Sequence, residues 1–125
     1  MNYFQKLFRS NFQEGESVRV SSSENTKVDI NNTQITITFK NGSINTILWD
    51  EVIKVSVITT DQGPIFDDVF LCLFTRNNLF EIPSEAIGYE VLLNDLSTYF
   101  KEFDFEEYIK AMSSSDNNEF ICWVK

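Results

Sequence analysis

Residues 34–49 read QITITFKNGSINTILW, and this stretch predicts a β-hairpin. Its first half alternates apolar and polar residues, which is the period of a strand with one buried face. Asn41 and Gly42 both tolerate positive φ angles, as the two-residue turns that join hairpin strands require. Such a turn predicts three facing pairs: Phe39 with Ile44, Ile37 with Thr46, and Ile35 with Leu48. Ile47 and Trp49 then lie on the opposite face, so we expect the end of the second strand to be covered on both sides.

Further strands are predicted on both sides of the hairpin by short runs rich in β-branched and aromatic residues. They are residues 27–30, 52–60, 69–74, 79–82 and 119–124. The run 69–74 is apolar on both faces, and Asn77 and Asn78 turn the chain between it and 79–82, which predicts a second hairpin. All strands that precede the helices fall within 26–83.

The hydrophobic period changes to a helical one after these strands. An apolar stripe predicts a helix over 84–101, with Ser84 as its N-cap. The stripe consists of Tyr89, Leu92, Leu93, Leu96 and Phe100. A second helix is predicted over 104–113, where Asp104 caps the first turn and Glu107 reaches back to it. Its expected buried face consists of Phe105, Tyr108, Ile109 and Met112.

The N-terminal segment 1–15 predicts a short amphipathic helix that ends before Gly15. Residues 2–12 carry large apolar side chains at helical spacing, next to Lys6 and Arg9. A helix that packs on the domain is favoured over one that lies on a membrane surface, because two basic residues are few for binding anionic lipid.

These elements predict a single domain over 1–125 of the α+β class. About six to seven antiparallel strands in meander order indicate a small barrel or a strongly bent sheet, which the C-terminal amphipathic helix would cap. The pleckstrin-homology-like superfold has this order of elements. Because a fold alone carries no function, function has to be inferred from the residues.

The chain contains no histidine, which excludes a Ser–His or Cys–His catalytic pair and removes the commonest metal ligand. The neighbouring acids Asp67 and Asp68, on a strand, and Glu106 and Glu107, on a helix, point in different directions, so neither pair predicts a two-carboxylate site. The four glycines are scattered and form no phosphate-binding loop. We therefore expect no enzyme activity, no cofactor and no metal site.

Charge is distributed unevenly along the chain, and this limits the classes of partner. The net charge is −9; residues 1–60 are neutral overall, whereas residues 61–119 hold 13 acids and three bases. Clustered Lys and Arg side chains are lacking, so nucleic acid and membranes are not expected partners. The acidic half either keeps the protein in solution or attracts a basic protein.

Cys72 and Cys122 each lie within an apolar run, which predicts buried free thiols rather than a disulfide. No stretch approaches the roughly 20 apolar residues of a membrane span, and no basic region precedes a long apolar run at the N-terminus. The cytoplasm is therefore the expected location.

Seven short segments form a recognisable set. They are 47–52 (ILWDEV), 59–64 (TTDQGP), 67–70 (DDVF), 82–86 (IPSEA), 103–104 (FD), 111–112 (AM) and 120–123 (FICW). Together, over about residues 44–123, they resemble a group of small bacterial proteins that are similar to pleckstrin-homology-like modules. The resemblance implies that fold and brings no catalytic residues with it. By class, it also implies an immunity partner of a secreted toxin.

Two segments of the acidic half are candidates for partner binding. The loop 61–68 places the apolar pair Ile65 and Phe66 among the acids Asp61, Asp67 and Asp68. The start of the last helix contributes the acids Glu102, Asp104, Glu106 and Glu107. The apolar pair either plugs the end of the barrel or anchors a partner, and the helix acids are either a solvated helix start or part of the same surface.

The leading hypothesis is a non-enzymatic cytosolic protein-binding module, in its most concrete form an acidic immunity protein that blocks a basic toxin domain. The alternative is a pleckstrin-homology-like adaptor or a self-associating scaffold, which pairs through strand edges or forms a homodimer. A carboxylate-only hydrolase is a distant third. A small-molecule substrate is not expected.

Overall fold

The computed structural model describes residues 26–61 and 69–125. In chain order the elements are β1 (Lys27–Ile30), β2 (Gln34–Thr38), β3 (Ile44–Leu48), the short 3-10 helix η2 (Trp49–Glu51), β4 (Lys54–Thr59), β5 (Val69–Phe74), β6 (Leu79–Pro83), α2 (Tyr89–Tyr99), α3 (Phe105–Met112) and β7 (Asn118–Val124). The α+β class and the order of strands and helices are confirmed. The expected N-terminal helix over 1–15 and the loop residues 62–68 lie outside the described residues.

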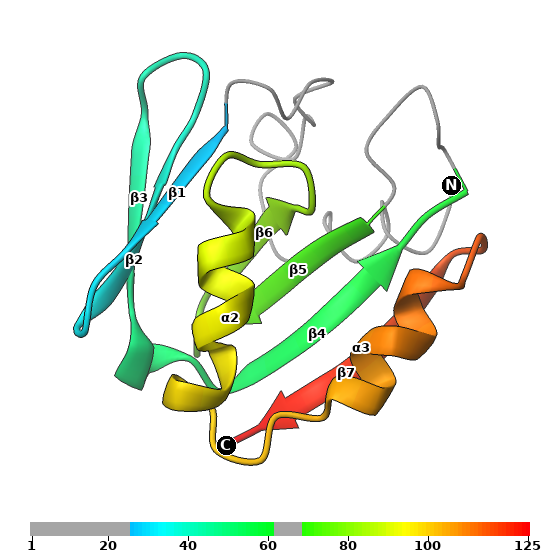
Figure 1. Cartoon of the computed structure of the whole chain (residues 1–125). Helices are drawn as coiled ribbons and strands as arrows, with labels where there is room; N and C mark the ends of the chain where they lie inside the picture. Colours follow the sequence, from blue (N-terminus) through cyan, green and yellow to red (C-terminus); the bar gives the residue numbers. More distant parts are fainter. Residues whose placement is uncertain (1–25, 62–68) are drawn as a thin grey trace.

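The strands of the described residues form two antiparallel sheets (Figure 1). The first sheet has the order β1-β2-β3, and the second has the order β6-β5-β4-β7. β4 pairs with β5 along one edge and with β7 along the other, so it has no edge left for β3. The expected barrel is therefore wrong. The chain leaves the first sheet after β3, passes through η2 and enters the second sheet at β4.

The first hairpin is present, but its register is one residue away from the expected one. Ile35 pairs with Ile47 and not with Leu48, and the other two expected pairs shift in the same way. A shift of one residue moves every side chain of a strand to the other face. Ile47 is accordingly buried on the same face as Ile35, whereas Leu48 is exposed. The expected cover on both sides of the second strand is therefore wrong.

The turn of this hairpin explains the shift, because it has three residues, 40–42, instead of two. The backbone N–H of Phe39 donates to the carbonyl oxygen of Ser43 at 2.9 Å, and the N–H of Gly42 donates to that of Phe39 at 2.9 Å. Gly42 has a φ of 87°, the left-handed conformation that ends three-residue hairpin loops.

α2 begins at Tyr89, later than the sequence predicted, and Ser84 is not its N-cap. The backbone N–H of Ser84 donates to the carbonyl oxygen of Val69 at 3.0 Å, which continues the pairing of β5 with β6. Ile87 then forms a bridge to β1. This strand-like pairing delays the helix until Gly88, which is the N-cap with a φ of 89°.

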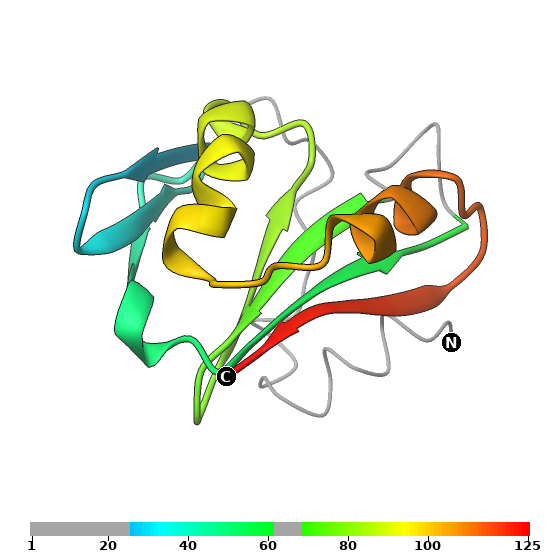
Figure 2. The ribbon, with the colours of Figure 1, turned by 60° about the horizontal axis from the view of Figure 1, so that its bottom comes forward.

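α2 lies at the junction of the two sheets (Figures 1 and 2), and its buried side chains belong to the main core. Its predicted stripe is confirmed: Tyr89, Leu92, Leu96 and Phe100 are buried, and Leu93 is half-buried. β5 is buried on both faces, since Leu71 and Leu73 join the main core and Phe70 belongs to a second, smaller cluster on the other face. Cys72 and Cys122 are buried and form no disulfide, as predicted.

Four aromatic rings connect the first sheet, α2 and the second sheet. The rings of Trp49 and Tyr99 are stacked with their centroids 3.8 Å apart. Phe100 contacts the edge of Trp49 at 5.6 Å and packs on Trp123 of β7 at 4.7 Å. The indole N–H of Trp49 donates to the carbonyl oxygen of Asn31 at 2.7 Å. These contacts fix the end of α2 between the sheets.

Candidate protein-binding surface

α3 carries a row of exposed apolar side chains. The helix packs against β7 and β4 on one face of the second sheet (Figure 2). Phe105, Ile109 and Met112 follow one another at intervals of about one turn and are 39%, 67% and 44% exposed. The expectation that these three side chains form the buried face of the helix is therefore wrong. We refer to them as the α3 row; grouped exposed apolar side chains indicate an interaction site.

The buried side of α3 consists of Tyr108 and Ala111 instead. The hydroxyl oxygen of Tyr108 lies 2.9 Å from that of Tyr89 in α2, and the backbone N–H of Asp104 donates to the carbonyl oxygen of Cys122 in β7 at 2.8 Å. Burial raises the pKa of both tyrosines, so both hydroxyls stay neutral and keep their hydrogen bond at neutral pH. These two contacts fix the rotation of α3 and turn the α3 row towards solvent.

Phe105 connects the α3 row to the core. Its ring packs on that of Phe103 with the centroids 4.7 Å apart. Phe103 is buried in the main core. An aromatic side chain that is held in place in this way loses little conformational freedom when a partner covers it, which is a property of binding hot spots.

Carboxylates border the α3 row at its N-terminal end. Glu102, Asp104 and Glu106 are exposed, and Asp104 caps α3 as predicted, accepting a hydrogen bond from the backbone N–H of Glu107 at 3.1 Å. Glu106 lies about 60° around the helix from Ile109, directly beside the row. The structure thus brings the four predicted helix acids together around the first turn of α3.

Glu107 differs from the other three acids because it forms an ion pair. Its Oε1 lies 2.8 Å from Nζ of Lys110, and this hydrogen bond raises the pKa of the lysine. The predicted return bond from Glu107 to the N–H of Asp104 is not formed, because that N–H donates to Cys122. The charge beside the α3 row therefore comes mainly from Glu102, Asp104 and Glu106.

Asp61 lies at the other end of α3. Its backbone N–H donates to Oδ1 of Asn117 at 3.3 Å, in the turn between α3 and β7. The eight residues of α3 span about 12 Å, so the structure separates Asp61 from the acids of the first turn. The other predicted loop residues, Ile65, Phe66, Asp67 and Asp68, lie outside the described residues, and their expected role as plug or anchor stays a prediction.

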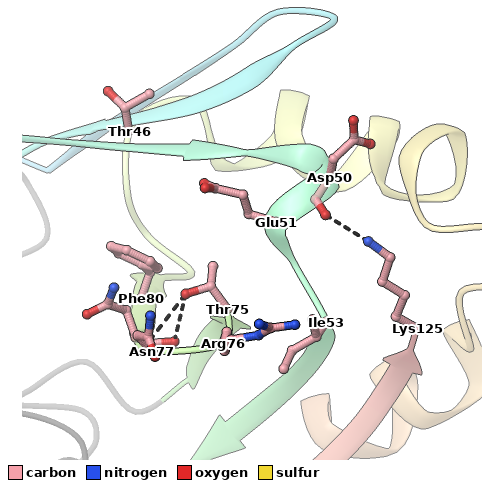
Figure 3. A pocket seen from close by; sticks show the side chains of 10 residues that line it. Thr46, Asp50, Glu51, Ile53, Thr75, Arg76, Asn77, Phe80 and Lys125 are labelled. Carbon is pink, nitrogen blue, oxygen red and sulfur yellow. Dashed lines mark hydrogen bonds between the residues drawn. The ribbon is translucent and has the colours of Figure 1, made fainter.

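A pocket of about 390 Å³ lies away from α3, between β3 and the turn that joins β5 to β6 (Figure 3). Thr46 of β3, Glu51 and Ile53 line it on one side, and Arg76 and Phe80 line it on the other. Nothing in the sequence pointed to this pocket. Its walls come from segments that are separate in the chain, and these segments pair with different strands. Its volume is at the lower end of the range for ligand sites.

The thiol nearest to the α3 row is chemically inert. Burial raises the pKa of Cys122 to about 12, and the charges of Asp104 and Glu107 act in the same direction. A thiol in this environment is not a nucleophile at neutral pH.

Within residues 26–61 and 69–125, no group of three or more His, Cys, Asp or Glu side chains is placed to hold a metal ion. No helix of the described residues has the length and apolar character needed to cross a bilayer.

The sequence did contain a signal for the α3 row. The apolar side chains Phe105, Tyr108, Ile109, Ala111 and Met112 cover about 160° of the circumference of the helix. The stripe that a surface helix buries is closer to about 100° wide. A helix with this wider stripe leaves part of it exposed unless a second element covers it.

A comparison with protein-family models finds no match, and neither do comparisons with curated proteins and with solved structures. The role of the α3 row is therefore inferred from its own residues and their surroundings.

Proposed function

We propose that this chain is a non-enzymatic module that binds a basic partner protein on the α3 row, and most concretely that it is an immunity protein that blocks a basic toxin domain. The observation that carries the proposal is the row itself, in which Phe105, Ile109 and Met112 are exposed next to a cluster of carboxylates. An apolar centre with a charged border is the composition of a protein–protein interface.

The charge around the α3 row selects the class of partner. Glu102, Asp104 and Glu106 stand beside it, and the whole chain has a net charge of −9. These negative charges attract a cationic partner over a distance, and they disfavour wrong orientations of that partner. In the cleft of a nuclease-type toxin, the carboxylates of α3 would occupy the place of substrate phosphates.

A pleckstrin-homology-like relationship and a cytoplasmic location are parts of the same proposal. Antiparallel sheets with an amphipathic helix at their junction support the first. The two buried cysteines, which form no disulfide, support the second, because disulfides are rare in the reducing cytoplasm.

The test compares two single substitutions of exposed apolar residues on helices. Ile109→Lys places a cation in the centre of the α3 row, and Val91→Lys makes the same change on α2, where Val91 is 57% exposed. The unmodified chain and both variants are used to capture proteins from the cells that produce it, and captured proteins are identified by mass spectrometry. We expect a protein with a basic domain to bind the unmodified chain and Val91→Lys, and Ile109→Lys to bind it about tenfold more weakly or worse.

Equal capture by Ile109→Lys, with the same melting temperature as the unmodified chain, would contradict the docking surface. The immunity form of the proposal has a separate test. The captured basic domain, produced in cells that lack this chain, should stop growth, and growth should return with the unmodified chain but not with Ile109→Lys. Unimpaired growth of cells that produce the domain alone would contradict immunity.

A further inference from the structure

No strand of the described residues pairs with the outer edge of β3. Among residues 26–61 and 69–125, β3 is the last strand of the first sheet and pairs with β2 alone. The backbone N–H of Trp49 donates to the carbonyl oxygen of Thr33 at 3.2 Å, so Trp49 faces β2. Hydrogen-bonding direction alternates along an antiparallel strand. The N–H and C=O groups of Ile44, Thr46 and Leu48 therefore point away from β2.

The sequence of β3, INTIL, lacks two of the features that usually protect an edge strand, charged side chains and proline. In the part of the chain that the structure describes, the outward groups of Ile44 and Thr46 have no hydrogen-bond partner, and the N–H of Leu48 makes only a long contact of 3.4 Å to Oε1 of Glu51. The outer edge of β1, by contrast, is covered by Ile87.

The 390 Å³ pocket lies along the same edge (Figure 3). Thr46 belongs both to the open edge and to the pocket wall, and Ile53 and Phe80 give the pocket apolar surface. The carboxylate of Glu51 points into the space between Thr46 and Phe80 (Figure 3). Glu51 has no ion pair among residues 26–61 and 69–125. Arg76 and Lys125 also line the pocket, but beside Ile53 and Asp50 and away from Thr46, and Nζ of Lys125 donates to the carbonyl oxygen of Asp50 at 2.8 Å (Figure 3). On its Thr46 side the pocket therefore offers an acidic group and an apolar wall next to strand-pairing groups that no described residue pairs with.

We propose that the edge of β3 accepts an extended segment of a partner protein as an added strand, and that the pocket receives a Lys or Arg side chain of that segment. Ile44 and Thr46 supply the backbone hydrogen bonds, Phe80 contacts the aliphatic stem, and Glu51 pairs with the cation. A second copy of this chain fits poorly, since each copy has a net charge of −9 and an edge of five residues is small for a stable homodimer. This surface is separate from the α3 row, because α3 packs against the second sheet whereas β3 belongs to the first (Figure 1).

Heptapeptides selected against the intact chain from a random phage-displayed library are the probe. We expect them to carry β-branched residues in alternation with Lys or Arg. The decisive variant is Thr46→Pro, which removes an outward N–H and leaves the hydrogen bonds to β2 in place. Thr46→Val keeps that N–H and is its control. In fluorescence anisotropy with a labelled selected peptide, we expect Thr46→Pro to weaken binding about tenfold and Thr46→Val to change it less than about twofold.

Glu51→Gln is the second variant, and it keeps the proposal testable if thermal melting shows that Thr46→Pro does not fold. It changes an exposed side chain, so we expect the fold to be kept and the affinity for the basic peptides to fall about threefold or more. Peptides that bind a folded Thr46→Pro or Glu51→Gln with unchanged affinity would overturn the proposal. A library that yields no binders, or only peptides that Ile109→Lys abolishes, would overturn it as well.

Discussion

Three buried weak acids meet where α2, α3 and β7 come together: Tyr89, Tyr108 and Cys122. Burial raises the pKa of all three groups, to about 12 for Cys122. In the unfolded chain these groups return to their ordinary values, about 8.5 for a cysteine and about 10 for a tyrosine. In alkaline solution the folded protein therefore keeps protons that the unfolded chain loses.

We expect the free energy of unfolding to fall as the pH rises from about 8.5 towards about 12. The unfolded state binds fewer protons over this range, so the slope is negative and reaches about 1.4 kcal/mol per pH unit for each group. Urea unfolding at about pH 8, 9 and 10 measures it. Cys122→Ala should show a shallower fall than the unmodified chain. Identical slopes for the two proteins would contradict the raised pKa of the thiol.

Burial of single residues was easier to predict than their pairing. Cys72 and Leu92 are buried as predicted, because each belongs to a local pattern, an apolar strand or a helical stripe. The pairing of Ile35 with Ile47 depends on whether the loop has two or three residues. An Asn-Gly pair occurs in both kinds of loop, so the pattern alone could not decide the register.

At the scale of elements, Gly88 determines how closely α2 approaches β1. It has a φ of 89°, and a Cβ atom added there would overlap the carbonyl oxygen of Val28. Gly42 has a similar φ of 87° but has open space around it. A comparison of substitutions at these two glycines therefore separates the effect of backbone conformation on stability from the effect of close packing.

Gly88→Ala is expected to lower the free energy of unfolding by about 2–4 kcal/mol, because β1 and the start of α2 have to move apart. Gly42→Ala should cost only about 1 kcal/mol, since it meets the backbone penalty alone. Urea unfolding of both variants measures the difference. Equal losses would show that α2 does not start in close contact with β1.

The orientation of α3 could not be predicted from its own sequence. Its apolar stripe is wide enough for several choices of buried face, and the choice is made by the contact between Tyr108 and Tyr89 and by the bond from Asp104 to Cys122. Both contacts join segments that are distant in sequence. The acids of the first turn were predicted as a candidate site, whereas the exposed apolar side chains beside them were assigned to the core.

At the scale of the whole molecule, local patterns predicted the strands but not their partners. β4 pairs with β7, which follows it in the chain only after β5, β6 and both helices. This long-range pairing fills the second edge of β4 and prevents a closed barrel. Nothing within either strand distinguishes this partner from the others, so the division into two sheets became visible only in the structure.

Association with a basic partner is expected to slow as the salt concentration rises, because the attraction between the exposed charges is screened. Glu106 lies beside the α3 row, whereas Glu107 already pairs with Lys110. We expect Glu106→Gln to lower the association rate constant by about two- to threefold at low salt, and Glu107→Gln to lower it less. Stopped-flow measurements with the captured partner give both rates. An association rate that does not depend on salt would contradict steering by charge.

Methyl NMR tests docking on the α3 row most directly, because exposed isoleucines are spread over the surface. Ile109 lies in the row, and Ile44, Ile87 and Ile121 are 60%, 56% and 47% exposed elsewhere. Titration of the chain, labelled at its isoleucine methyl groups, with the captured basic partner should shift the Ile109 signal and leave those of Ile87 and Ile121 unchanged. An Ile109 signal that stays unchanged at saturation, while another exposed isoleucine shifts, would contradict the α3 row as the docking site.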